Sequence, residues 1–131
     1  MRSYVLDTHG CIFMLASPKK LGAAARAAIL AVEAGRAQAW LPAAAVAEVV
    51  LLRSLGRTDV GLPELHRAFR ACPRFRFLPL DLAQLDEFAA LGAIRDPFDR
   101  LVVAAARQQD ARLITRDGTI SDAGLVDTVW G

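Results

Sequence analysis

Two acidic residues each follow a short apolar run that is typical of a buried strand. Asp7 comes directly after Tyr4-Val5-Leu6, and Asp117 follows Leu113-Ile114-Thr115-Arg116. In an open sheet of parallel strands, functional groups gather beyond the carboxyl ends of the strands. We therefore expect both carboxylates at the same edge of a sheet, where they could form part of one acidic pocket.

The stretch Arg95-Asp96-Pro97-Phe98-Asp99-Arg100 places two more carboxylates three residues apart at the start of an Ala-rich helix. Asp96 is a preferred N-cap residue, and Pro97 suits the first helical position because its missing N–H would have no partner there. Asp99 falls at the third helical position, where the positive end of the helix dipole favours a negative charge. Taken alone, the pair is equally well explained as a capping box with Asp in place of Glu.

Glu48 is the remaining candidate, and it lies among apolar residues of a helix expected from Pro42 to about Leu55. A carboxylate in such surroundings either extends to solvent or is kept there because it has a functional role. Clustered carboxylates repel and raise one another's pKa values, and a hard divalent cation relieves that repulsion. Mg²⁺ and Mn²⁺ prefer such oxygen ligands and keep exchangeable waters, which suits metal-assisted phosphodiester hydrolysis. The sequence has no Gly-rich phosphate loop, Walker lysine, GxSxG motif or CxxC pair that would indicate other chemistry.

Short apolar strands alternate with helices along the whole chain. We expect strands at 3–7, 37–41, 74–80, 112–115 and 125–130, a turn at 61–63, and helices at 8–15, 21–34, 42–55, 64–71, 82–91 and 97–109. Such alternation with short connections predicts an α/β fold with a parallel sheet flanked by helices. The 131 residues suffice for a single domain, 1–131, that buries about two-thirds of its unfolded surface.

Composition limits the compartment and the partners. Hydrophobic residues make up 54% of the chain, which disfavours disorder, and no apolar run approaches the ~20 residues of a membrane span. Cys11 and Cys72 belong to no CxxC or Cys/His cluster, so we expect reduced core thiols, no structural zinc and a cytoplasmic location. The formal net charge is only +2, yet four arginines within 67–76 form a dense basic segment. Such a segment suits phosphate contacts or, equally, a solvated helix face.

Three stretches carry a resemblance to a known family. The runs Tyr4-Val5-Leu6-Asp7-Thr8-His9, 95–101 and Leu113-Ile114-Thr115-Arg116-Asp117 resemble the three signature blocks of PIN domains, and more narrowly those of the VapC-type toxin ribonucleases of bacterial toxin–antitoxin pairs. The resemblance covers essentially the whole chain and implies a three-layer α/β/α sandwich with a central, mainly parallel sheet. It also implies a Mg²⁺- or Mn²⁺-dependent endoribonuclease that hydrolyses RNA, forms a homodimer and binds a small antitoxin protein.

The same resemblance implies which residues carry the activity. The acidic quartet of the family, which is both catalytic and metal-binding, corresponds to Asp7, Glu48, Asp99 and Asp117. Asp96 corresponds to an extra acid that could support the site or only cap the helix, and Thr115 corresponds to a hydroxyl near the metal.

Two departures from the family pattern leave other functions open. Ala43-Ala44-Ala45 stands where family members often carry serines, which leaves the orientation of Glu48 undecided, and Gly10-Cys11 stands where larger apolar residues are usual. One alternative is a non-catalytic PIN-like module that binds RNA or a protein partner. Another is an aspartyl-nucleophile phosphatase using Asp7, although His9 replaces the second acid of that class. Metal-dependent RNA cleavage and a phosphomonoester assay distinguish the three.

Overall fold

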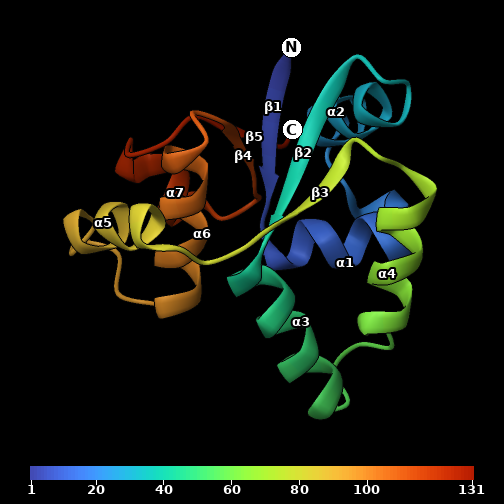
Figure 1. Ribbon diagram of the computed structural model, residues 1–131, viewed down its shortest axis with the longest axis horizontal. Coiled ribbons are helices and arrows are strands. Elements are labelled where there is room, and N and C mark those ends of the chain that lie inside the picture. Colours follow the sequence, from blue (N-terminus) through green and yellow to red (C-terminus); the bar gives the residue numbers. More distant parts are fainter.

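A computed structural model describes residues 1–131 and shows helices on both faces of a five-stranded sheet (Figure 1). The strands are β1 (Arg2–Leu6), β2 (Ala37–Pro42), β3 (Phe75–Leu78), β4 (Arg112–Ile114) and β5 (Thr128–Val129). Every neighbouring pair is parallel, in the order β3-β2-β1-β4-β5. The helices are α1 (Thr8–Ala16), α2 (Ala23–Glu33), α3 (Ala43–Ser54), α4 (Leu62–Ala71), α5 (Leu82–Ala90), α6 (Pro97–Gln108) and α7 (Gly118–Ala123), with a 3₁₀ turn η1 (Pro18–Lys20). The predicted three-layer α/β/α fold is confirmed.

The sheet separates two hydrophobic cores, because its central strands bury both faces. Tyr4 and Leu6 of β1 pack with α1 and α2, whereas Val5 between them packs with α6 on the opposite face. Strands covered on both sides are expected to be apolar, as Tyr4-Val5-Leu6 of β1 and Leu113-Ile114 of β4 are. Figure 1 shows α1, α2 and α4 on one side of the sheet and α5, α6 and α7 on the other.

Small side chains let α6 approach the sheet closely. Ala104, Ala105 and Ala106 have no solvent exposure, and Val102 and Val103 complete a continuous buried run. The helix packs against β1, β4 and α5, so its first turn is fixed in position relative to the end of β1. This packing places the Asp96–Asp99 segment near the carboxyl edge of the sheet.

Several element boundaries differ from those expected. The helix α4 begins at Leu62, not at residue 64, because the Glu64 carboxylate accepts a hydrogen bond from the Gly61 N–H (3.1 Å) and so caps the helix from within its first turn. The outer strands β3 and β5 are shorter than the predicted strands 74–80 and 125–130, since each has only one neighbour with which to pair.

The start of α2 also differs, and the C-terminal segment explains it. The helix begins at Ala23, after η1, and the Ala25 N–H donates to the carbonyl of Trp130 (2.9 Å). A Cβ on Gly22 would collide with this same carbonyl, so the close approach requires glycine. A backbone group more than a hundred positions away along the chain therefore satisfies one of the free N–H groups of the first helical turn.

Both cysteines are free thiols, as expected: Cys11 is buried and Cys72 is half-buried. Burial, and then the nearby Asp7 charge, raises the pKa of Cys11 to about 12, which makes its thiol a packing group. None of the helices has the length and apolar character needed to cross a membrane.

Candidate active site

The strand order creates a crevice where β1 and β4 lie side by side. The chain leaves β1 toward β2 and β3 on one side, and reaches β4 and β5 on the other, so the connections diverge beyond the carboxyl ends of β1 and β4. Ligands of open α/β sheets bind at such a switch point. Asp7 and Asp117 follow these two strands, and the Asp7 N–H donates to the Ile114 carbonyl at 3.2 Å.

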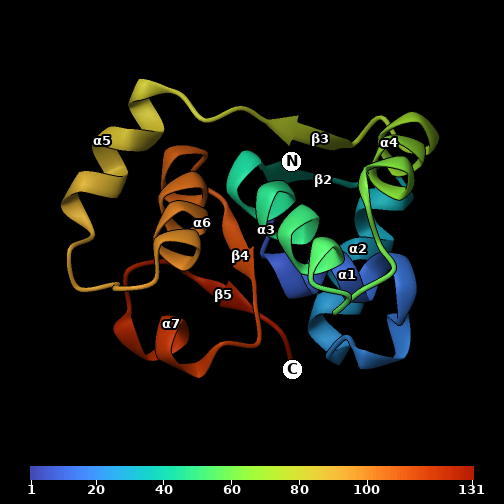
Figure 2. The ribbon, with the colours of Figure 1, turned by 90° about the horizontal axis from the view of Figure 1, so that it is seen from below.

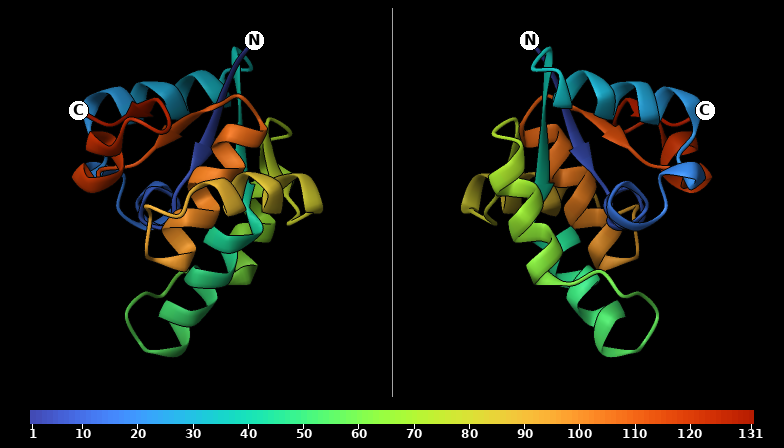
Figure 3. Two further views of the ribbon diagram at one scale, coloured as in Figure 1. Left: turned by 90° about the vertical axis from the view of Figure 1, so that its left-hand side faces the viewer. Right: turned by 90° about the vertical axis from the view of Figure 1, so that its right-hand side faces the viewer.

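One pocket of about 440 Å³ at this edge contains all four predicted acids. Its lining comprises Asp7, Thr8, His9, Glu48, Asp96, Asp99, Val102, Arg116 and Asp117. Figure 2, seen from below, shows α3 in front of the sheet edge with α1 and α6 on either side. Figure 3 shows that α3 extends beyond the sheet at the end opposite to α2. The pocket thus draws on α1, α3, α6 and the segment after β4, and eight of its nine lining residues are polar or charged.

Three of the pocket's carboxylates also cap helices. Asp7 Oδ1 accepts from the Gly10 N–H (2.7 Å) at the start of α1, and Asp96 Oδ1 accepts from the Asp99 N–H (2.9 Å) at the start of α6. Asp117 Oδ1 accepts from the N–H groups of Thr119 (2.8 Å) and Ile120 (3.3 Å) at the start of α7. In each case the cap uses Oδ1 and holds the carboxylate in one orientation, while Oδ2 makes no such bond.

Asp99 is not used in this way. The expected capping box at α6 forms only in part: Asp96 caps Asp99, but the Asp99 side chain makes no reciprocal bond to the Asp96 backbone. Its carboxylate is therefore not used in the helix cap, and Asp99 lines the pocket.

Glu48 reaches the pocket although its helix lacks a side-chain cap. The helix α3 starts directly after β2, with Pro42 at the N-cap and no hydroxyl to satisfy its first N–H groups. Ala44 and Ala45 are buried in the core, which lets α3 pack closely between α1 and α6. The alanines at 43–45 therefore do not turn Glu48 away from the other acids.

Burial and mutual repulsion disfavour charge on two of the carboxyls. The pKa of Asp99 is raised to about 6. Burial is the largest cause, and the negative charges of Asp96, Asp117, Glu48 and Asp7 contribute the rest. Burial also raises the pKa of Asp7, and the Asp117 charge adds to the effect. The Thr115 hydroxyl, the Gly10 N–H and His9 act in the opposite direction on Asp7. These carboxyls lie close enough to repel one another, as predicted.

The donor set suits a hard divalent cation, although no preformed cage exists. No three acidic, histidine or cysteine groups in the protein converge closely enough to hold one ion directly. Mg²⁺ commonly binds through one or two carboxylates and keeps several waters, so direct convergence of three is not required. A pocket that gathers five carboxyl groups, two of which have raised pKa values, matches this kind of ion.

Thr115 lies behind the pocket rather than in its lining. It is 1% exposed, and its hydroxyl accepts from the Asp117 N–H at 3.1 Å. The same hydroxyl lowers the pKa of Asp7. Thr115 thus connects the two acids that follow β1 and β4.

Sequence reasoning gave no role to two residues that shape the site. A Cβ at Gly10 would lie 2.9 Å from Asp7 Oδ1 and 3.4 Å from the Ile114 carbonyl, so only glycine leaves Asp7 its position. Arg116 lines the pocket, and its guanidinium lies 4.8 Å from the centroid of the Phe13 ring. The unusual glycine at position 10, where the family has larger residues, could have indicated the role of Gly10. Nothing in the sequence indicated the contact of Arg116 with Phe13.

The fold and site define an α/β protein with an acidic pocket at the switch point of a parallel sheet. The PIN domain family profile matches residues 4–125, and the chain belongs to this family. A search of curated proteins found no match.

Solved structures share the fold at low sequence identity. VapBC2 from Rickettsia felis bound to a DNA fragment from their promoter has a TM-score of 0.71 and 14% identity, covering 98% of this chain and 99% of that chain. FitAcB from Neisseria gonorrhoeae has a TM-score of 0.66 and 22% identity, covering 95% of both chains. A toxin-antitoxin complex from Klebsiella pneumoniae has a TM-score of 0.58 and 18% identity, covering 87% of this chain and 86% of that chain.

Proposed function

We propose that this PIN domain is a metal-dependent endoribonuclease that serves as the toxin of a toxin–antitoxin pair. The observation that carries the proposal is the gathering of Asp7, Glu48, Asp99 and Asp117 around one pocket at the switch point of the sheet. These four would hold Mg²⁺ or Mn²⁺, with Asp96 and Thr115 in supporting roles. The two raised pKa values indicate a site that favours a cation.

The bound ion would supply Lewis-acid stabilisation of phosphate charge and a more acidic water. The chain's own groups do the positioning. The Gly10 N–H and the N–H groups at the start of α7 fix one oxygen of Asp7 and of Asp117, which leaves the other oxygen of each without a backbone donor. Arg116 lies at the rim with its guanidinium over Phe13, where it can pair with a phosphate oxygen of the bound strand.

Cleavage of RNA by the purified chain tests the reaction. We expect cleavage with Mg²⁺ or Mn²⁺, none with a chelator, and none in Asp7→Asn, Asp99→Asn or Asp117→Asn, each of which removes one ligand charge. Asp86→Asn is the matched control, because Asp86 is exposed on α5 and lies outside the pocket. If all three pocket variants cleave like the wild type, the shared metal site is wrong.

A phosphomonoester assay separates the hydrolase alternatives. An aspartyl-nucleophile phosphatase would pair Asp7 with a second acid two residues further on, whereas His9 stands at that position. We therefore expect no release of phosphate from a small phosphomonoester. Binding of RNA without cleavage under every metal condition would instead identify a non-catalytic module.

We further propose a homodimer in the cytoplasm that binds a small antitoxin. The similar toxin-antitoxin complex from Klebsiella pneumoniae supports the partner class. Several large apolar side chains are exposed on α3 and its surroundings, including Leu51, Leu55, Leu62 and Phe77, which suits assembly. Light scattering at micromolar concentration is expected to show a dimer; a strict monomer would contradict that assignment.

A further inference from the structure

A second pocket lies at the opposite edge of the sheet, where the strands begin, and arginines dominate its rim. Strand register explains their convergence. Arg2 pairs with Ala37, and two residues further along β1 Tyr4 pairs with Arg112, so Arg2, Tyr4 and Arg112 project from one face of the sheet. Arg36 directly precedes β2 beside them. Arg2 of β1, Arg112 of β4 and Arg36 just before β2 therefore line one pocket on the face covered by α2.

Small residues of α2 provide the concave surface between them. The pocket has a volume of about 440 Å³ and is lined by Arg2, Tyr4, Ala24, Ala27, Ala28, Ala31, Arg36, Ala37, Arg112 and Val129. No acidic residue is among them. Tyr4 is 4% exposed and is one of the residues that line this pocket. A buried phenol and three arginines thus face one cavity.

None of these arginines is neutralised by the protein. The two ion pairs of the chain join Arg67 to Glu64 (3.4 Å) and Arg107 to Glu87 (2.9 Å). Arginine binds phosphate through two parallel N–H···O bonds, and a concave surface with several guanidiniums can engage more than one phosphate oxygen. The arrangement is that of an anion site.

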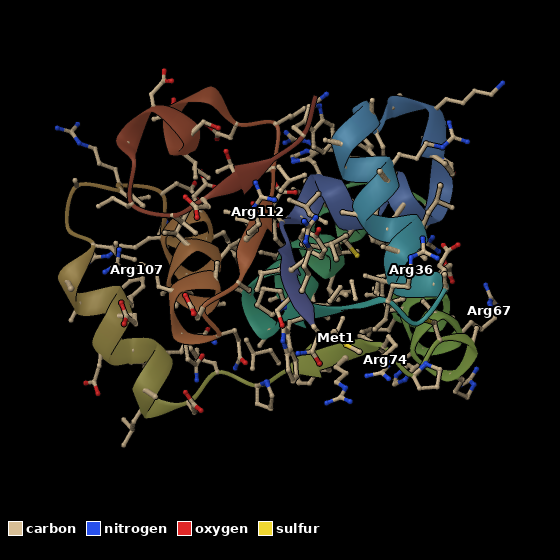
Figure 4. All side chains as sticks on the ribbon, turned by 90° about the horizontal axis from the view of Figure 1, so that it is seen from above. Met1, Arg36, Arg67, Arg74, Arg107 and Arg112 are labelled. Atoms are coloured by element: carbon tan, nitrogen blue, oxygen red, sulfur yellow. The ribbon has the colours of Figure 1, made fainter.

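Further arginines lie at the same end of the molecule as the pocket. Figure 4, seen from above, shows Met1, Arg36, Arg67, Arg74, Arg107 and Arg112 distributed across this end of the molecule. The carboxylates of the candidate active site lie at the other end of the strands. The arginine pocket and the acidic pocket therefore lie at opposite ends of the sheet.

We propose that the arginine pocket of Arg2, Arg36 and Arg112 binds backbone phosphates of the RNA substrate at a distance from the bond that is cut. The inference rests on the proposed function. An acidic cleavage pocket repels a polyanion, so affinity must come from cationic groups elsewhere. Five residues of β1 separate the two pockets by about 16 Å at ~3.3 Å per residue, so the RNA must extend several nucleotides beyond the scissile phosphate.

A triple variant, Arg2→Gln with Arg36→Gln and Arg112→Gln, tests this. The matched control is the triple Arg26→Gln, Arg57→Gln and Arg70→Gln, which removes the same charge from exposed arginines outside the pocket. Binding of a labelled RNA is measured by fluorescence anisotropy in chelator over a range of salt. We expect the pocket variant to bind at least tenfold more weakly, with a salt slope reduced by about 2, since each lost phosphate contact on a single strand removes about 0.7.

Cleavage kinetics provide the second measurement. With a long RNA, the pocket variant should show a raised KM and an unchanged kcat, whereas a tetranucleotide that spans only the acidic pocket should be cut equally by both proteins. Thermal melts verify that the variants are folded. Unchanged RNA affinity and salt slope in the pocket variant would overturn the inference even if the wild type is an active ribonuclease.

The two proposals can fail separately. If the wild type cuts no RNA but the pocket variant alone loses RNA affinity, the arginine pocket stands and the nuclease assignment fails. If inorganic phosphate raises the melting temperature of the wild type but not of the pocket variant, while both bind RNA equally, the pocket holds free phosphate and the assignment to RNA is overturned.

Discussion

Removing the Asp99 charge should stabilise the metal-free protein while abolishing cleavage. Asp99 lies at the third position of α6, and its carboxylate makes no cap of its own. Asp99→Asn keeps the side-chain shape and removes a charge that four neighbouring carboxylates oppose. The same substitution removes a proposed metal ligand, so stability and activity should move in opposite directions.

The magnitude follows from the pKa of Asp99. Its rise from an ordinary 3.8 to about 6 corresponds to about 3 kcal/mol at 1.36 kcal/mol per pH unit. Because the side chain is only partly buried, solvent screening reduces the expected gain to about 1 kcal/mol. Between pH 3.8 and about 6 the native state binds more protons than the unfolded state, so the stability of the wild type falls as pH rises through this window. Above about pH 6 the Asp99 carboxylate is charged, and the loss of stability that its charge causes has reached its full size.

Thermal melts of wild type, Asp99→Asn and the control Asp86→Asn at pH 4 and pH 8 test this reasoning. At pH 8 with chelator, Asp99→Asn should melt about 3–5 °C above the wild type, since ~1 kcal/mol shifts a domain of this size by that amount. At pH 4 the difference should be much smaller. Added Mn²⁺ should stabilise the wild type more than Asp99→Asn, because only the wild type keeps the full ligand set. Equal melting temperatures at pH 8, or equal stabilisation by Mn²⁺, would refute the account of Asp99.

Other variants test the local geometry. Asp96→Ala should cost about 1 kcal/mol and reduce cleavage only partly, whereas Asp96→Asn should melt like the wild type because Asn caps as well as Asp. Gly10→Ala should lower kcat at least tenfold by displacing the Asp7 carboxylate, while Gly92→Ala, with open space around it, should not change kcat. Ala105→Leu should destabilise the protein by about 1–3 kcal/mol, measured by urea unfolding, because Ala105 has no exposed surface and larger side chains overpack the core.

The central elements followed from the sequence because several local signals agreed. The apolar runs before Asp7 and Asp117 predicted β1 and β4, and the Asp96-Pro97 pair predicted the first residue of α6. Boundaries set by tertiary contacts were not predictable in this way. The start of α2 depends on the carbonyl of Trp130, which no local pattern indicates. The ends of the outer strands β3 and β5 depend on how far β2 and β4, their single neighbours, extend beside them.

The site was predictable in its acids and not in their supporting contacts. Parallel strands bring Asp7 and Asp117 to one edge by topology alone, so their positions required no knowledge of packing. Glu48 required packing, because α3 reaches the pocket only through the close contact that buried Ala44 and Ala45 allow. Arg2, Arg36 and Arg112 share one pocket because of the register between strands that are far apart in the sequence. The amino-acid composition could not predict that register.

The capping role of three acids links the stability of the fold to the geometry of the pocket. For Asp7, Asp96 and Asp117, one carboxylate oxygen accepts from the backbone of the following helix, and this bond orients the second oxygen. Substitution by Ala at these positions removes a cap and a charge together, so loss of activity would be ambiguous. Substitution by Asn keeps the cap acceptor and removes only the charge. Because Asp99 and Glu48 cap nothing, Ala and the matching amide (Asn at position 99, Gln at position 48) should affect stability in the same direction. This comparison separates groups that hold the helices from groups that only face the pocket.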